Sequence, residues 1–215
     1  MALILKKSFS HGWYYHYHLH TEKASMLCEA YPSLEQYLQR LPQDCPNEPF
    51  QRGPRGSKIK QPLATSLTAM HGHEVCQFAR AGMENSKYKS AHFNVQMWML
   101  LHDSKTICIE VPLWLDSGEH PALEQFLGTC GPLSGHIDLL RVENGKIWIW
   151  DYKPNAAKEK YASMQTFLYA IMLSERTKIP LEEFRCGYFD EQHAFAFIPS
   201  AHVLVPVLAK QPVVE

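Results

Sequence analysis

The alternation of hydrophobic and polar positions is clearest around Asn144-Gly145, which separates two apolar runs rich in β-branched and aromatic residues. Asn-Gly between such runs is the strongest short-range signal for a β-hairpin. A two-residue type I′ turn pairs Glu143 with Lys146, and the same register places Asp138 opposite Asp151. A three-residue loop with a bulge shifts this register by one residue, so the pairing of the two aspartates stays open at this point.

The same patterns predict the other elements. Alternation and β-branched content predict strands at residues 13–20, 106–115, 184–189 and 194–198. Apolar stripes at helical spacing predict helices at residues 32–41, 64–83, 88–102 and 155–176. Five prolines and two glycines predict a loop at residues 42–62. That loop carries Arg52, Arg55, Lys58 and Lys60, which suit contacts to phosphates, although a solvated loop explains them equally well.

Composition limits the classes of protein. A chain of 215 residues with 46% hydrophobic content can bury a sizeable core as one domain. With 21 basic and 22 acidic residues, any contact to nucleic acid must come from a local patch. The six cysteines form no C-x-x-C pair, which is typical of reduced thiols in the cytosol. Because no signal-like or membrane-spanning apolar stretch is evident, we expect a cytoplasmic protein without a membrane partner.

Acidic residues interrupt the predicted strands. Like charges directly opposite each other destabilise a strand pair, so Asp138 and Asp151 favour a divalent cation between them. The alternative is an ordinary hairpin whose acids face water at its open end. Glu110 interrupts the apolar run 106–115, where an unpaired buried carboxylate is costly. An edge strand with Glu110 facing water is again the alternative, and Pro112 favours it.

Several histidines are placed where zinc ligands occur. His16, His18 and His20 share one face of a predicted strand, but no fourth ligand is evident, so an aromatic strand with polar edges is preferred. The segment His73-Glu74-Val75-Cys76-Gln77 lacks the second histidine of the H-E-x-x-H motif. A third class of protein, a zinc protein or small-molecule hydrolase built on these histidines, therefore lacks a complete ligand set.

Three motifs in this order resemble the PD-(D/E)XK nucleases, specifically the RecB-type exonuclease branch: Gly135-x-x-Asp138, Asp151-Tyr152-Lys153 and Gln165-x-x-x-Tyr169. Glu110 and a helical histidine precede them. The resemblance implies an α/β, restriction-endonuclease-like core, a central mixed sheet flanked by helices in the order αβββαβ. Residues 63–200 would form this core, residues 1–62 an N-terminal elaboration of the same domain, and residues 201–215 a C-terminal extension.

The resemblance also implies an activity, the hydrolysis of DNA phosphodiesters with Mg²⁺ or Mn²⁺. Asp138 and Asp151 would bind the metal, with Glu110 as a further ligand and Lys153 as the lysine of the motif. The helical histidine, a further metal ligand, would be His73, with His71 as a rival. Three residues would line the site and contact DNA: Gln165, Tyr169 and Tyr152.

Two departures narrow the expectation. Members of this branch with an iron-sulfur cluster group three of four cysteines after the QxxxY helix, whereas only Cys186 follows Tyr169 here, so no cluster is expected. No helicase motif is present, so the chain would at most serve a helicase or recombination partner. A scaffold that binds nucleic acid without cleaving it is the alternative function, and retention of every acid and of Lys153 weakens it.

Overall fold

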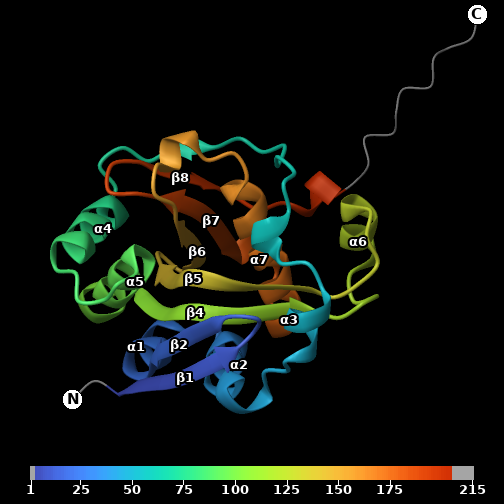
Figure 1. Ribbon diagram of the computed structural model, residues 1–215, viewed down its shortest axis with the longest axis horizontal. Coiled ribbons are helices and arrows are strands. Elements are labelled where there is room, and N and C mark those ends of the chain that lie inside the picture. The colour runs from blue at the N-terminus through green and yellow to red at the C-terminus, as the bar shows by residue number, and fades with distance from the viewer. Residues whose placement is uncertain (1–2, 205–215) are drawn as a thin grey trace, which may run out of the picture.

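One eight-stranded sheet organises the molecule. The computed structural model describes residues 3–204, and the strand order is β1-β2-β4-β5-β6-β7-β8-β3 (Figure 1). All neighbouring strands are antiparallel except β6 and β7, which are parallel. The strands are β1 (Ile4–Ser10), β2 (Tyr14–His20), β3 (Thr68–Ala69), β4 (Thr106–Leu115), β5 (Leu133–Glu143), β6 (Lys146–Tyr152), β7 (Phe184–Phe189) and β8 (Ala194–Phe197).

The β5–β6 hairpin turns at two residues, as the Asn-Gly signal predicts. Asn144 has φ 50° and Gly145 has φ 65°, and a type I′ turn requires positive values at both positions. Backbone pairing stops at Leu139–Trp150, one residue before the two aspartates. The two-residue register is therefore confirmed, and Asp138 and Asp151 lie where the ladder opens.

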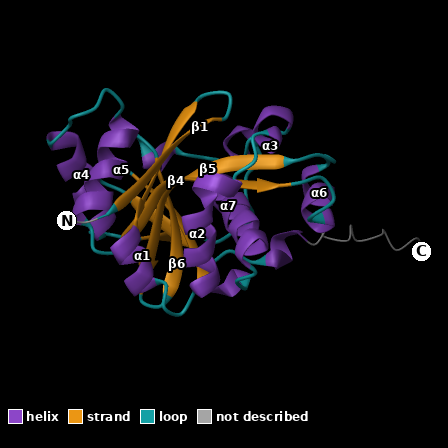
Figure 2. Cartoon of the chain, turned by 90° about the horizontal axis from the view of Figure 1, so that it is seen from below, coloured by secondary structure: helices purple, strands orange, loops and turns teal. Residues whose placement is uncertain are grey.

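Helices cover both faces of the sheet. Helices α1 (Thr21–Leu27), α2 (Pro32–Asp44) and α7 (Ala162–Thr177) lie on one face, and α4 (Glu74–Glu84) and α5 (Ala91–His102) on the other (Figures 1 and 2). Two separate hydrophobic clusters follow this division, one containing residues of α2 and α7 and the other residues of α4 and α5. The mixed sheet flanked by helices confirms the predicted fold class.

Helix α7 connects the two parallel strands β6 and β7. Parallel neighbours need a crossover connection, and an α-helix is its usual form. Nearly every residue of α7 is buried, because the helix packs against β4, β5, β6 and β7 together. Its first turns consequently lie beside the end of β6 that carries Asp151. None of the helices within residues 3–204 has the length and apolar character needed to cross a membrane.

The helix predicted for residues 64–83 begins only at Glu74. Residues Thr68–Ala69 instead form β3, which pairs with β8 from the far end of the chain. Gly72, with φ 67°, turns the backbone out of helical geometry, and the His73 ring accepts a hydrogen bond from Val75 N at 3.3 Å as a cap. The prediction is wrong for residues 64–73 because pairing with a distant strand outweighs the apolar stripe.

Two further boundaries differ from the prediction. Helix α7 begins at Ala162 and not at Asn155, whose φ of 65° precedes a single 3₁₀ turn, Ala156–Lys158. The predicted loop at residues 42–62 contains α3 (Glu48–Arg52) and the 3₁₀ turn Gly56–Lys58. Strand β1 and the short helices α1 and α6 (Pro121–Leu127) were not predicted. Most of the extension expected at residues 201–215 lies outside the described residues.

Candidate active site

A cavity of about 180 Å³ opens where strands β4 and β5 approach helices α5 and α7. Its wall also includes residues of β2 and of the loop that follows α3. The predicted site residues on this wall are Glu110, Asp138, Lys153, Gln165 and Tyr169. Residues from seven separate parts of the sequence thus meet at one hollow, which lies at the open end of the β5–β6 hairpin.

Glu110 belongs to an interior strand, because β4 pairs with β2 on one side and β5 on the other. The alternative of an edge strand with Glu110 facing water is therefore wrong. Glu110 has φ 52°, and its neighbours Ile109 and Val111 pack into the two different hydrophobic clusters. Gln96 Nε2 of α5 donates a hydrogen bond to Glu110 Oε1 at 2.7 Å. Burial and the charge of Asp151 raise the pKa of Glu110 even though this hydrogen bond lowers it.

Asp138 lies where the β5–β6 ladder ends. The backbone N–H of Tyr152 donates to Asp138 Oδ2 at 3.1 Å, so a side-chain oxygen takes over from the strand backbone as acceptor. Burial and the neighbouring charge of Glu110 raise the pKa of Asp138, against the lowering effect of Lys153. Asp138 therefore carries its negative charge at a cost that a cation in the cavity would reduce.

Asp151 lies directly behind the cavity wall, with 1% of its surface exposed. Gln165 Nε2 donates to its Oδ1 at 2.7 Å, and Lys153 Nζ forms an ion pair with its Oδ2 at 2.6 Å. Burial and the charge of Asp138 raise the pKa of Asp151 to about 7. The charges of Glu110, Asp138 and Asp151, on three adjacent strands, thus raise one another's pKa values. Asp138 and Asp151 lie close together, as the hairpin register predicts.

Lys153 follows β6 immediately and is held by its backbone N–H, which donates to Phe189 O at 2.8 Å. Its side chain is 22% exposed, toward the cavity that it lines. Burial lowers the pKa of Lys153, but the charges of Asp151 and Asp138 outweigh it and raise that pKa above its ordinary value. The ammonium therefore keeps its proton at neutral pH.

Gln165 and Tyr169 project from the same face of α7, one turn apart. Gln165 Nε2 is also 3.2 Å from Tyr169 Oη, so the two side chains form one hydrogen-bonded unit with Asp151. The Tyr169 ring lies against the backbone of Gly135, where a Cβ atom would come within 2.2 Å of the ring. Glycine is thus required at position 135 because any side chain would displace Tyr169.

With this geometry in place, comparison with protein families becomes informative. The profile of the PD-(D/E)XK nuclease superfamily matches residues 11–211, almost the whole chain. The chain belongs to the PD-(D/E)XK nuclease superfamily. A comparison with curated individual proteins finds no match. Membership in the superfamily implies a nucleic-acid substrate.

The structure does not bring His73 to the nuclease cavity. His73 caps α4, and its ring centre lies 5.4 Å from that of Trp150 on the α4–α5 face of the sheet. His71 does not line the cavity either, whereas His92 near the start of α5 does. Burial lowers the pKa of His92 while the charge of Asp151 raises it. Of these three histidines only His92 lines the cavity, and no sequence pattern distinguishes it from the others.

Tyr152, predicted to contact substrate, points to the opposite face from its neighbours Asp151 and Lys153. Its side chain is 1% exposed, and its hydroxyl donates to Glu191 Oε1. Its ring packs edge-on against His92 at 5.0 Å. Tyr152 thus supports the wall of the site from behind, and it does not line the cavity.

Tyr15 and His136 also line the cavity and were not predicted, and Arg55, which lines it too, was named only as one of four loop residues suited to phosphate contacts. The rings of Tyr15 and His136 stack with centres 3.7 Å apart, and Arg55 donates to the Tyr15 hydroxyl and to His11 O. Burial and the charge of Arg55 act together to lower the pKa of His11 to about 4. The alternating aromatic residues 13–20 were the available signal, since they predicted a strand with one aromatic face.

The donor set fits a hard divalent cation. Within residues 3–204 no three His, Cys, Asp or Glu side chains form a compact metal-binding group. Mg²⁺ does not need one, because it keeps several waters and binds through one or two carboxylates. Asp151 Oδ2 makes no hydrogen bond among the described residues beyond its ion-pair contact with Lys153. Carboxylate oxygens are the donors that such an ion prefers, and Asp138 and Glu110 present theirs on the cavity wall.

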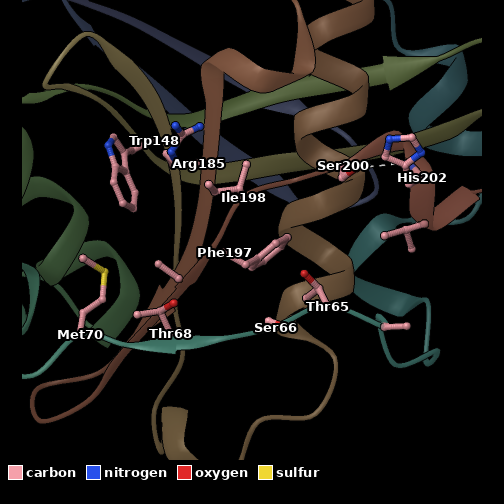
Figure 3. A pocket seen from close by; sticks show the side chains of 13 residues that line it. Thr65, Ser66, Thr68, Met70, Trp148, Arg185, Phe197, Ile198, Ser200 and His202 are labelled. Carbon is pink, nitrogen blue, oxygen red and sulfur yellow. Dashed lines mark hydrogen bonds between the residues drawn. The ribbon is translucent and has the colours of Figure 1, made fainter.

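A larger cavity of about 830 Å³ lies on another part of the molecule, beside β3 and β8 (Figure 3). Trp148, Phe197 and Ile198 supply much of its wall, and Arg185 is the charged residue there. Among the described residues, its wall contains no carboxylate and none of the motif residues. Its size therefore does not make it the candidate active site, because it lacks the acids that line the smaller cavity.

Proposed function

We propose that this protein is a Mg²⁺- or Mn²⁺-dependent deoxyribonuclease of the RecB-type branch, acting as an exonuclease on phosphodiester bonds. The observation that carries the proposal is the convergence of three acids from adjacent strands beside Lys153: Glu110 and Asp138 line one cavity, and the buried Asp151 lies behind its wall in an ion pair with Lys153. Each acid has a raised pKa because it is buried near another acid. Such an arrangement costs stability and is expected where function requires it.

In this proposal the three acids hold the divalent cation. Asp138 faces the cavity, Asp151 Oδ2 contacts the Lys153 ammonium, and Glu110 is oriented by Gln96. When bound, the cation supplies Lewis-acid polarisation of the phosphate and lowers the pKa of water. The acids must be ionised to bind it, so their raised pKa values couple metal binding to proton release.

Lys153 acts as a charged donor beside the scissile phosphate. Its raised pKa keeps the ammonium protonated at neutral pH, so it stabilises negative charge that develops on phosphate oxygens. Its backbone is fixed to Phe189 and its side chain lines the cavity. A fixed donor loses little free energy in reorganising as the charge develops.

Gln165, Tyr169 and His92 position the acids and the strand. Gln165 fixes the orientation of Asp151, and Tyr169 is held by its close packing on Gly135. His92 takes the position on the cavity wall that the sequence suggested for His73. We assign these three residues to the substrate side of the cavity because their polar atoms border the same hollow as Lys153.

The RecB-type assignment extends to cofactor and partners. No iron-sulfur cluster is expected, since Cys186 is the single cysteine after Tyr169, and its buried Sγ contacts Thr166 O at 3.4 Å. Because the chain lacks helicase motifs, a helicase or recombination protein is the partner class that this branch suggests.

The test is incubation of the purified protein with single-stranded, linear duplex and circular DNA, and with RNA, in Mg²⁺, Mn²⁺ or EDTA. Linear DNA is expected to be degraded from its ends only with the metal, and circular DNA to stay intact. Asp151→Ala is expected to abolish degradation. DNA binding without any metal-dependent cleavage would contradict the proposal and favour a scaffold.

A further inference from the structure

Aromatic side chains are unusually exposed on two segments beside the nuclease cavity. Trp13 and Tyr14, at the tip of the β1–β2 hairpin, are 75% and 68% exposed. Tyr88, in the loop between α4 and α5, is 44% exposed. We call these three residues the aromatic rim. Figure 2 shows the β1–β2 hairpin projecting from the sheet between α5 and α3.

Both segments border the cavity. Tyr15, the residue after Tyr14, lines it, and so does His92 in the first turn of α5 after the Tyr88 loop. Phe93 joins the segments, because its ring lies 4.7 Å from that of Tyr88 and 5.9 Å from that of His16 on β2. Phe93 therefore connects the Tyr88 loop to β2, the strand that follows the hairpin tip.

The hairpin tip is held in place by buried contacts. The His11 ring is stacked on Phe50 with centres 3.6 Å apart, and its Nδ1 lies 3.0 Å from Nε2 of His136 on the cavity wall. At the tip itself, His11 N donates to Trp13 O at 2.9 Å. The exposed rings of the tip thus stand on a rigid base, which reduces the entropy lost when they bind a ligand.

The Tyr88 loop is fixed in the same way. The buried amide of Asn94 accepts hydrogen bonds from Lys87 N and Tyr88 N at 2.8 Å each. The same amide donates to Tyr88 O at 2.8 Å. Three hydrogen bonds therefore orient a short loop whose side chains Lys87, Tyr88 and Lys89 are all exposed. A buried polar side chain used to hold an exposed aromatic ring indicates a binding surface.

We propose that the aromatic rim is a stacking platform that binds single-stranded DNA and leads the strand into the cavity. This inference rests on the proposed nuclease function. Aromatic rings flanked by lysines are the usual means of binding single strands, because every unpaired base has a face that can stack. Lys87 and Lys89 flank Tyr88, and Lys6 lies opposite His18 on the hairpin.

The dimensions of the cavity favour one strand over a duplex. Its volume of about 180 Å³ is below the roughly 300–1,000 Å³ of pockets that enclose a drug-sized ligand. It therefore cannot enclose a base-paired segment, and at most part of one strand can enter it. Bases in a duplex are already stacked on each other, so the rim gains contacts with a single strand that a blunt duplex does not provide.

The test measures binding in EDTA, without hydrolysis, by fluorescence anisotropy. The probes are a labelled oligothymidylate of roughly 16 nucleotides, matching the upper site size of single-strand binding folds, and a blunt duplex of the same length. The Trp13→Ala/Tyr14→Ala variant is expected to raise the Kd for the single strand about 10- to 100-fold. Tyr88→Ala is expected to raise it about fivefold, and the Kd for the duplex should change less than about threefold.

Matched variants separate stacking from general damage. Trp13→Phe/Tyr14→Phe keeps the aromatic faces and should stay within about threefold of the natural protein. Met26→Ala, on α1 and 74% exposed, is the control for loss of an exposed apolar side chain. Trp13 fluorescence should be quenched by the oligothymidylate, and this part of the quenching should disappear in Trp13→Phe.

The proposal is overturned if the natural protein does not bind the oligothymidylate. It is likewise overturned if the double alanine variant binds both probes more weakly by the same factor, or binds both as the natural protein does. It is also overturned if that variant abolishes self-association while DNA binding is unchanged, because the rim is then a protein interface. If the double alanine variant still cleaves DNA and binds the oligothymidylate normally, the stacking role of the aromatic rim is overturned and the proposed nuclease function is not. Rim-dependent binding without metal-dependent cleavage overturns the proposed nuclease function alone.

Discussion

The molecule contains two clusters of buried charged residues, and strand β5 contributes to both, through Asp138 and, three residues later, Arg141. Asp138 belongs to the acidic cavity, and Arg141 is the centre of a second cluster with Asp103, Glu74 and Glu143. Both clusters contain three acids. They differ in the number of bases, because Lys153 alone pairs with the cavity acids among the described residues, whereas Arg141 and Lys105 share the acids of the second cluster.

The Arg141 cluster satisfies its charges internally. The Arg141 side chain is 0% exposed, and its Nε donates to Asp103 Oδ2 at 2.8 Å. Lys105 Nζ contacts Glu74 at 2.8 Å and Glu143 at 2.7 Å. Burial raises the pKa of Glu74, but its hydrogen bonds to Lys105 and Arg141 outweigh this and lower it. This cluster joins α4, β5 and the segment between α5 and β4, and none of its members lines the cavity at Asp138.

The difference teaches how to distinguish a structural charge cluster from a functional one. Acids with enough bases have lowered pKa values, as Glu74 does, whereas acids without them have raised values, as Asp151 does. A protein tolerates the second arrangement when a ligand of opposite charge completes it. In this molecule the incomplete cluster is also the one that borders a cavity.

The largest expected effect concerns the complete cluster. Asp103→Ala leaves the Arg141 guanidinium buried and short of a partner, and should lower the free energy of unfolding by about 3–5 kcal/mol. Urea unfolding followed by circular dichroism measures this. Asp44→Ala, which removes an exposed pair with Arg40, is the control and should cost less than about 1 kcal/mol. A loss below about 1 kcal/mol for Asp103→Ala would show that Arg141 does not depend on this partner.

The second prediction contrasts the two lysines. Lys153→Ala removes the donor beside the cavity and should lower the rate of DNA hydrolysis about 10²- to 10³-fold. Lys105→Ala removes a comparable ammonium from the other cluster and should reduce stability while leaving the rate per folded molecule unchanged. Initial rates on labelled linear DNA, corrected for the folded fraction, measure both. Equal losses in the two variants would contradict the division into functional and structural clusters.

The third prediction uses pH. The pKa of Asp151 is raised to about 7 in the folded protein, so the folded state binds a proton that the unfolded state has released from about pH 4 upward. In EDTA the natural protein should therefore lose stability relative to Asp151→Asn as pH rises to about 7, by at most about 1.4 kcal/mol per pH unit.

Thermal unfolding at a series of pH values measures this difference between the two proteins. Above about pH 7 the difference should level off. Adding Mg²⁺ should stabilise the natural protein at high pH, by about 2.7 kcal/mol at a hundred times the Kd, and should have little effect on the variant. If the stability difference between the natural protein and Asp151→Asn did not change with pH, the raised pKa of Asp151 would be contradicted.

The smallest effect distinguishes the two histidines. His73→Ala removes the cap of α4 and should cost about 1 kcal/mol of stability without changing DNA hydrolysis. His92→Ala, on the cavity wall, should lower the hydrolysis rate about tenfold, below the 10²- to 10⁴-fold typical of a general acid or base, because we assign it a positioning role. The opposite result, loss of hydrolysis with His73→Ala alone, would return the helical histidine to position 73.

Local chemistry allowed part of this structure to be predicted. Asn144-Gly145 specified a two-residue turn, and the two-residue side-chain period of strands then brought Asp138 and Asp151 to one site. Helical spacing likewise placed Gln165 beside Tyr169. The fold class followed from the order of these elements and their resemblance to a nuclease family. Each of these features depends on residues close together in sequence.

What the sequence by itself determined is therefore the turn, the register and the motif residues, because short-range backbone geometry is encoded by neighbours. The tertiary structure alone decided that His92 and not His73 borders the cavity, and that residues 68–69 form a strand against β8. It also decided that Arg55 joins the site. These outcomes depend on packing between segments far apart in the chain, and no local pattern records which distant partner a residue will contact.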